Sequence, residues 1–326
     1  MKFLPFLALL ALAVPPAPKY RIIAQLPAGD GGWDLLSVAP TDQRLYVAHG
    51  DGVTAFDLRT GKATDSIVPG QRVHAALAIP GTHDVLSTNG QTNNALLFDG
   101  RTGKVRATIP TGTKPDAAAY DPATRTVWIM NPGSGDITVV DPASAKVLAT
   151  VPVGGSLEMG EADGRGRMYV NVEDKNEVAV LDTRTRKVVT RFPLDGCDGP
   201  SGIAVDSRDK EIISACGGNA VAIVSAPDGR QLAKLAIGWG ADGAAYDPVH
   251  RYALVPGGRD GNLTVIRLGP KPAVVQQLPT AVSARTIAVD PSTGRAYLPS
   301  AALAPAPAGQ RPKAVPGSFR VLVVGS

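Results

Sequence analysis

The stretch that decides the fold is residues 116–152, DAAAYDPATRTVWIMNPGSGDITVVDPASAKVLATVP. It divides into four short segments separated by turns, at 116–120, 126–131, 136–141 and 146–152. Asp121-Pro122 favours a tight turn, because proline presets the backbone angle and the aspartate can accept a bond from the backbone ahead. The stretch therefore predicts a small sheet of four consecutive antiparallel strands.

The same unit recurs along the chain. Segments resembling 116–137 begin at Ser201, Asp242 and Arg285. A later turn repeats as FDLRTGK from 56, FDGRTGK from 98, VDPASAK from 140 and LDTRTRK from 181. Its aspartates are at positions 57, 99, 141 and 182, at intervals of 42, 42 and 41 residues. A fixed period in the forties without helical periodicity is typical of β-propeller blades.

Seven inner strands can be counted, which predicts an all-β, seven-bladed propeller. The last unit has no outer strand of its own at the C-terminus. Residues 20–27 (YRIIAQLP) match the outer-strand pattern of 147–152 (VLATVP), so we expect the N-terminal strand to complete the last blade. Such closure would remove open sheet edges that invite aggregation. A Pro/Ala-rich insertion at 301–317 lengthens the connection between the second and third strands of blade seven, either as a flap beside the channel mouth or as a tolerated surface loop.

Composition excludes several classes of protein. Of 326 residues, 44% are hydrophobic and 19% charged, which is unlike a disordered chain. The 36 glycines and 28 prolines indicate frequent turns and disfavour a coiled coil or a multispanning membrane protein. A formal net charge of +4 is weak evidence for a nucleic-acid partner, and we expect none.

The N-terminus has the layout of a secretory signal peptide. One lysine precedes the apolar run 3–13, which ends in Ala-Leu-Ala. We expect cleavage after residue 13 and a single propeller domain at 14–326, periplasmic or secreted, monomeric and without a membrane span; an uncleaved anchor is the alternative. In an oxidising compartment Cys197 and Cys216 favour a disulfide, with two free buried thiols as the alternative.

Four of the stretches that end the second strand of a unit carry a family resemblance. YVAH from 46, LSTN from 86, WIMN from 128 and YVNV from 169 resemble the YVTN-type β-propeller repeat, over about residues 20 to 324. The family is similar to bacterial lactonase-type seven-bladed propellers and to the propeller that carries haem d1 in some nitrite reductases. The resemblance implies the fold and an exported binding or scaffold protein, but a fold does not choose among activities.

Aligning the units predicts two rings of side chains at the channel mouth. Equivalent positions before or in the inner strands hold Asp34, His74, Asp116, Glu158, Ser201, Asp242 and Arg285. Equivalent positions at the end of the second strands hold His49, Asn89, Asn131, Val172, Cys216, Gly257 and Ser300. The carboxylates, with Asn89 and Asn131, are candidate oxygen ligands for a divalent cation such as Ca²⁺. The alternative is a solvated polar rim. Glu161, inside an inner strand, needs a partner or a proton.

Other candidate residues point less clearly to chemistry. His49 and His74 could hold a transition metal or haem if they approached each other. Trp33 and Trp239 could stack a flat ligand at the channel mouth, or they could pack within their loops. GxSxG, HExxH and CxxCH motifs are absent. We therefore expect a protein that binds a ligand or a protein partner at the top face, which is the face around the channel mouth, and that has no identifiable set of catalytic residues. The alternative is a metal-dependent, lactonase-like hydrolase that uses the acidic mouth.

Overall fold

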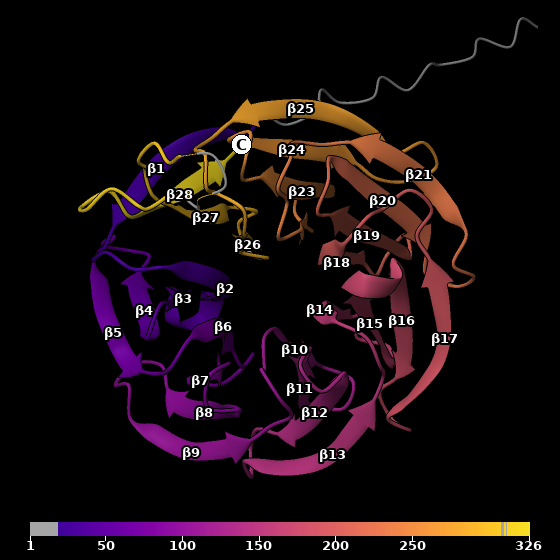
Figure 1. Ribbon diagram of the computed structural model, residues 1–326, viewed down its shortest axis with the longest axis horizontal. Helices are drawn as coiled ribbons and strands as arrows, with labels where there is room; N and C mark the ends of the chain where they lie inside the picture. The colour runs from indigo at the N-terminus through magenta and orange to yellow at the C-terminus, as the bar shows by residue number, and fades with distance from the viewer. Residues whose placement is uncertain (1–18, 308–309, 311) are drawn as a thin grey trace, which may run out of the picture.

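The computed structural model describes residues 19–307, 310 and 312–326, and these form a ring of seven four-stranded antiparallel sheets around a central axis (Figure 1). The predicted seven-bladed propeller is confirmed. The expected signal peptide lies outside the described residues. Within a blade the strands are called A to D from the axis outward. The top face is the end at which strand A begins, and the bottom face is the opposite end.

Blades one to three follow chain order. Blade one comprises β2 (Trp33–Ala39), β3 (Arg44–His49), β4 (Gly52–Asp57) and β5 (Ala63–Pro69). Blade two comprises β6 (Val73–Ala78), β7 (Asp84–Asn89), β8 (Asn94–Asp99) and β9 (Val105–Pro110). Blade three comprises β10 (Ala118–Asp121), β11 (Thr126–Asn131), β12 (Asp136–Asp141) and β13 (Lys146–Pro152). Three of the four strands predicted for blade three have the expected bounds, and only strand A is shorter.

Blades four to six continue the pattern. Blade four comprises β14 (Leu157–Ala162), β15 (Arg167–Val172), β16 (Glu177–Asp182) and β17 (Lys187–Pro193). Blade five comprises β18 (Pro200–Asp206), β19 (Glu211–Cys216), β20 (Ala220–Ser225) and β21 (Gln231–Ala236). Blade six comprises β22 (Ala245–Asp247), β23 (Tyr252–Gly257), β24 (Asn262–Arg267) and β25 (Ala273–Pro279).

Blade seven is closed by the N-terminal strand, as predicted. It comprises β26 (Ala288–Val289), β27 (Ala296–Ser300), β28 (Arg320–Gly325) and the outer strand β1 (Arg21–Pro27). β1 pairs antiparallel with β28, from Arg21 opposite Gly325 to Pro27 opposite Arg320. Just before β1, the buried Tyr20 hydroxyl donates to Asp247 of blade six at 2.5 Å. The first and last parts of the chain therefore hold each other in place.

The core lies between neighbouring blades. Trp128 and Met130 of blade three, for example, pack in one cluster with Met168 and Val170 of blade four. Short polar side chains add hydrogen bonds across the same gaps near the axis. Ser37 donates to the carbonyl of Ala76 at 2.6 Å, and Thr88 to that of Asp116 at 2.6 Å. These bonds satisfy inner-strand carbonyls, which are costly to leave unpaired when buried.

The repeated aspartates stabilise turns at the bottom face. In the C–D turn of blade one, Asp57 accepts bonds from the backbone N–H groups of Arg59 and Thr60. Asp99 does the same with Arg101 and Thr102 in blade two. The repeat is thus explained by hairpin chemistry. No helix in the described part of the chain is long and apolar enough to cross a bilayer.

Candidate binding site at the channel mouth

The strand registers show that the predicted ring is one equivalent position in all seven blades. In six blades the third residue of strand B lies opposite a fixed position of strand A, for instance Tyr46 opposite Ser37 and Tyr169 opposite Glu161. In blade seven the second residue, Tyr297, takes this place opposite Ala288. The ring residues lie three positions before that strand A residue in every blade: Asp34, His74, Asp116, Glu158, Ser201, Asp242 and Arg285. They therefore gather at the top end of the channel.

Five ring members alternate in charge from blade six through seven and one to blade three. Arg285 Nε donates to Asp242 Oδ2 at 2.7 Å, and its Nη2 lies 3.5 Å from Asp34 Oδ1. His74 Nδ1 lies 2.8 Å from Asp34 Oδ2 and 3.5 Å from Asp116 Oδ1. The order is Asp242, Arg285, Asp34, His74, Asp116, so each cation lies between two carboxylates.

This arrangement shifts the pKa values of the ring. The hydrogen bond to Asp34 raises the pKa of His74 and favours the imidazolium. Burial, with repulsion from Asp34, raises the pKa of Asp116 to about 6. Burial also raises the pKa of Asp242, against the attraction of Arg285.

Glu158 occupies the part of the ring that has no cation. It lies between Asp116 in blade three and Ser201 in blade five, and no described residue hydrogen-bonds its carboxylate. Burial, together with repulsion from the carboxylates of Asp116, Glu173 and Asp242, raises its pKa to about 9. Glu158 is therefore protonated at neutral pH unless a cation comes near it.

The other predicted residues near the axis have local partners. Ser201 is buried and donates to the carbonyl of Ala241 at 3.2 Å. Burial raises the pKa of Glu161 to about 8, and the backbone N–H of Val205 partly offsets this effect. Glu161 thus takes a proton at neutral pH, which is one of the two outcomes the sequence predicts for an acid in an inner strand.

The second predicted ring is not brought together as a site. Asn89 is buried; it accepts from the backbone of Gln71 and donates to Asn94. Asn131 is buried and donates to Asp136 and Thr138 within its own blade. Both side chains therefore fix B–C loops, and the expectation that they join the carboxylates as ligands is not supported by their contacts.

His49 does not join His74 either. Its ring stacks on Phe319 with centroids 4.2 Å apart, its Nδ1 bonds Thr54 at 2.9 Å, and burial lowers its pKa. Within the described residues, the group whose ligand atoms lie within 4.8 Å of one another is Asp34, His74 and Asp116. The proposed pair of histidines is thus replaced by one histidine between two carboxylates.

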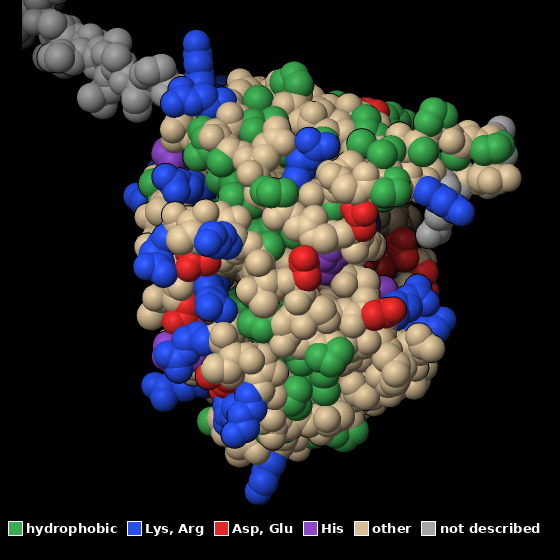
Figure 2. Space-filling model, turned by 90° about the vertical axis from the view of Figure 1, so that its left-hand side faces the viewer, with side chains coloured by type: hydrophobic (Ala, Val, Ile, Leu, Met, Phe, Trp, Pro, Cys, Tyr) green, Lys and Arg blue, Asp and Glu red, His purple; other side chains and the backbone are tan. Residues whose placement is uncertain are grey.

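A cavity of about 1100 Å³ opens above the ring, and Figure 2 shows carboxylates inside a hollow at one end of the molecule. Glu158, Glu173, Asp242, Trp33 and Arg285 are among the residues that line it. Trp33 is buried against Phe319, whereas Trp239 is 47% exposed at the top face. Sequence reasoning did not single out Glu173, because it follows strand B of blade four outside both aligned positions.

The insertion at 301–317 lies beside the mouth. Leu303 and Ala314 form an isolated antiparallel bridge, and both line the cavity. The backbone N–H of Gly317 donates to both carboxylate oxygens of Asp30, at 2.9 and 2.7 Å. The insertion therefore contributes one wall of the cavity, as a flap would.

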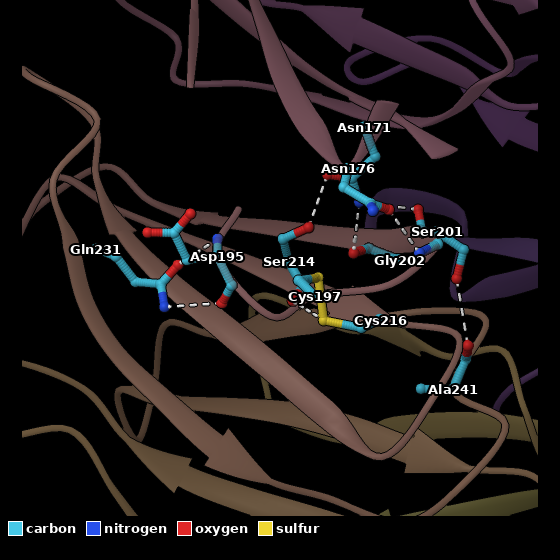
Figure 3. The surroundings of a disulfide bond; sticks show 11 residues. Asn171, Asn176, Asp195, Cys197, Ser201, Gly202, Ser214, Cys216, Gln231 and Ala241 are labelled. Carbon is cyan, nitrogen blue, oxygen red and sulfur yellow. Dashed lines mark hydrogen bonds between the residues drawn. A yellow bond between two sulfur atoms is a disulfide. The ribbon is translucent and has the colours of Figure 1, made fainter. Parts of the chain in front are cut away.

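Cys197 and Cys216 form a disulfide with an S–S distance of 2.07 Å (Figure 3). It joins the loop before strand A of blade five to the end of strand B. Beside it, Asn171 of blade four donates to the carbonyls of Ser201 and Gly202 at 3.1 and 2.9 Å and accepts from Ser214. Asn171 was missed at the sequence level because it falls one position before the aligned end of strand B.

Comparison with known proteins supports the fold alone. No protein-family model matches the chain, and no curated protein matches it. The WD40 repeats of RRP9 are similar, with a TM-score of 0.77, 13% identity, and coverage of 95% of this chain and 98% of that one. A chain of the mitotic checkpoint complex has a TM-score of 0.76, 13% identity, and coverage of 91% and 95%.

A chain of Kuenenia stuttgartiensis hydrazine synthase is also similar, with a TM-score of 0.71, 17% identity, and coverage of 83% and 94%. At these identities the likeness shows a seven-bladed propeller and nothing about activity. Membership of the YVTN repeat family stays a prediction.

Proposed function

We propose that this chain is an exported propeller-type binding protein that takes a positively charged group of its ligand or protein partner at the channel mouth. The observation that carries the proposal is the imbalance of the ring. Asp34, Asp116, Glu158 and Asp242 face one guanidinium and one imidazole, and Glu158 has neither cation beside it. Between Asp116 and Asp242 the ring positions hold Glu158 and Ser201 and no cation. We name Asp116, Glu158 and Asp242 the acidic arc.

The electrostatics of the acidic arc favour a cation as ligand. A buried carboxylate among like charges is unfavourable when ionised, and an added cation relieves that repulsion. Glu158 is the member without a partner, and it lines the cavity together with Asp242 and Glu173. An ammonium or guanidinium group placed there would gain charge-assisted hydrogen bonds in a partly desolvated site.

The surroundings suit a binding role. The cavity of about 1100 Å³ slightly exceeds the usual range for small-molecule sites, and it is open enough for a side chain of a protein partner. One structural neighbour is a chain of a mitotic checkpoint complex, which is consistent with a protein partner. Export is supported by the signal-peptide pattern at residues 1–13 and by the disulfide.

Two probes of equal length and opposite charge test the proposal. Isothermal titration calorimetry should detect binding of cadaverine, a diamine, and none of glutarate, a dicarboxylate. The variant E158Q/D242N should weaken cadaverine binding at least about tenfold, because two charge-assisted contacts are lost. E158Q alone serves if the double variant does not fold by circular dichroism.

The matched control is D195N/D198N, which removes two exposed top-face carboxylates outside the ring. It should bind cadaverine like the parent protein. Equal binding of glutarate, or unchanged cadaverine affinity in E158Q/D242N, would show that the acidic arc is not the site.

A second candidate function rests on Asp34, His74 and Asp116. One imidazole and two carboxylates form a donor set that suits a transition metal better than Ca²⁺, which prefers oxygen ligands alone. Such a metal would make the lactonase-like hydrolase reading feasible. Arg285, 3.5 Å from Asp34, opposes it by adding positive charge beside the site. Metal analysis of the purified protein and a lactone panel with added Mn²⁺ or Zn²⁺ would decide; no retained metal and no turnover would remove this candidate.

A further inference from the structure

The bottom face of the propeller presents many cations to solvent and turns most of its acids inward, with Asp209 and Asp228 exposed. Its A–B and C–D turns carry exposed lysines and arginines that form no ion pair with any described residue: Lys62, Lys104, Arg125, Lys146, Arg165, Arg184, Lys187, Arg208, Lys210, Arg230, Arg267, Lys271 and Arg295. We name this set the basic face. Figure 2 shows Lys and Arg crowded at the end of the molecule opposite the acidic hollow.

Most acids of the same turns accept hydrogen bonds from the backbone. Asp141 accepts from the N–H of Ala143, Asp182 from those of Arg184 and Thr185, and Asp121 from those of Ala123 and Thr124. All three carboxylates are buried or half-buried. The hairpin chemistry that forms the blades therefore draws negative charge into the turns and leaves the positive charge outside. A molecule of modest net charge thus has one strongly basic side.

The distribution of these cations fits a flat anionic surface. Lys62, Lys104, Lys146 and Lys187 occupy the same position in four consecutive blades, so these four are spaced along an arc of the rim. Other members of the basic face, such as Arg230 and Arg267, line a cavity. A nucleic-acid duplex would touch only a stripe of such a face. Single-stranded nucleic acid needs aromatic side chains for stacking. Among described residues the tyrosines near this face, such as Tyr120, Tyr246 and Tyr252, are not exposed.

We propose that the basic face docks the protein on a membrane surface rich in anionic lipids. Such a surface attracts each nearby lysine or arginine, and its mobile lipids can gather under cations arranged in an arc. Val249, 48% exposed in an A–B turn among these cations, could enter the headgroup layer. The orientation would leave the channel mouth facing away from the lipid, open to its own ligand. This inference concerns the opposite face and does not depend on the proposed cation site.

Vesicle co-sedimentation tests the docking with matched variants. The parent protein should bind vesicles of phosphatidylglycerol and phosphatidylcholine in about 50 mM NaCl, should not bind pure phosphatidylcholine, and should be released near 500 mM NaCl, because screening shortens the range of the attraction. K104Q/K146Q/K187Q should lower the partition coefficient by about a hundredfold, since each lysine contributes about fivefold at such a surface.

The control K114Q/K175Q/K234Q removes the same number of charges away from the basic face and should bind like the parent protein. Equal loss in both variants, or no binding to anionic vesicles at low salt, would overturn the proposal. Duplex DNA that competes the protein off the vesicles at equal charge concentration would also overturn it, in favour of a nucleic-acid partner.

Discussion

Glu158 lines the cavity at the channel mouth without a partner of opposite charge. Its neighbours along the ring, Asp116 and Ser201, offer it no positive charge, and burial keeps its carboxyl group protonated at neutral pH. The pKa of about 9 lies far above the ordinary value for glutamate, 4.5. Folding therefore favours the neutral form, and this preference has a measurable consequence.

We predict that E158Q is more stable than the parent protein at pH 9 and about equally stable at pH 4.5. The folded-state pKa is raised, so stability from the neutral carboxyl is present at low pH and is lost as the pH rises from about 4.5 toward 9. Glutamine cannot ionise and escapes that loss. Because Glu158 is partly exposed, we expect a gain of about 1 to 2 kcal/mol at pH 9. Urea unfolding of both proteins at the two pH values measures it.

The exposed Asp195 supplies the comparison. D195N should change the stability by less than about 0.5 kcal/mol at either pH. If the difference in stability between E158Q and the parent protein is the same at both pH values, Glu158 ionises in the folded protein without an energetic cost.

At the scale of one element, the disulfide of blade five fixes an inner strand at its entrance. It spans a sequence separation of 19 residues and lies beside the loop that carries Ser201 to the ring. Both sulfurs are buried. Its loss would loosen the loop in the unfolded chain and remove a brace in the folded one.

We predict that C197A/C216A lowers the free energy of unfolding by about 3 kcal/mol, the chain-entropy value for a loop of this size. Denaturant unfolding measures the loss. A reducing agent should lower the stability of the parent protein by a similar amount and leave the variant unchanged. Equal stability of parent and variant under oxidising conditions would mean that the bond does not constrain the chain.

Elements were more predictable from the sequence than contacts. The strands at 126–131, 136–141 and 146–152 follow from turn residues and apolar runs, which are local signals. The ring position also follows, because repeat symmetry carries one register to every blade. Where side chains point was not predictable. His49, Asn89 and Asn131 lie at equivalent positions, yet each forms a hydrogen bond with a residue of its own blade. The ring of His49 also stacks on Phe319, which comes from the other end of the chain.

At the scale of the whole molecule, the circle of seven blades is closed by contacts between residues more than 200 positions apart. Tyr20 donates to Asp247 across blades seven and six, and Gln276 bonds both the N–H and the carbonyl of Tyr20. These contacts anchor the chain just before β1 and thereby hold the outer strand of blade seven (Figure 1). Every ring residue depends on this closure for its place around the axis.

We predict that Y20F lowers the stability by about 1 to 3 kcal/mol, because it removes a buried hydrogen bond to a carboxylate. Y252F is the control: Tyr252 is also buried in this cluster, and its hydroxyl bonds no described residue. It should cost less than about 1 kcal/mol. Thermal or urea unfolding distinguishes the two, and equal losses would argue against a special role for the Tyr20–Asp247 bond in closure.

The same closed ring separates charge between its two ends. Turn aspartates at the bottom face are bonded to backbone, whereas the carboxylates at the top face converge on the axis with too few cations to match them. The position of a residue in the blade repeat thus decides whether an acid stabilises a turn or contributes to the acidic arc. The proposed cation site follows from the second case.

Proton release on cadaverine binding tests this account most directly. Near pH 7.5 Glu158 is protonated in the free protein, and an ammonium group at the acidic arc would lower its pKa and expel the proton. Calorimetric titrations in two buffers of different ionisation enthalpy should show release of up to about one proton per cadaverine bound by the parent protein, and far less by E158Q. Binding without proton release, or with the same release in E158Q, would contradict the assignment of the acidic arc as the cation site.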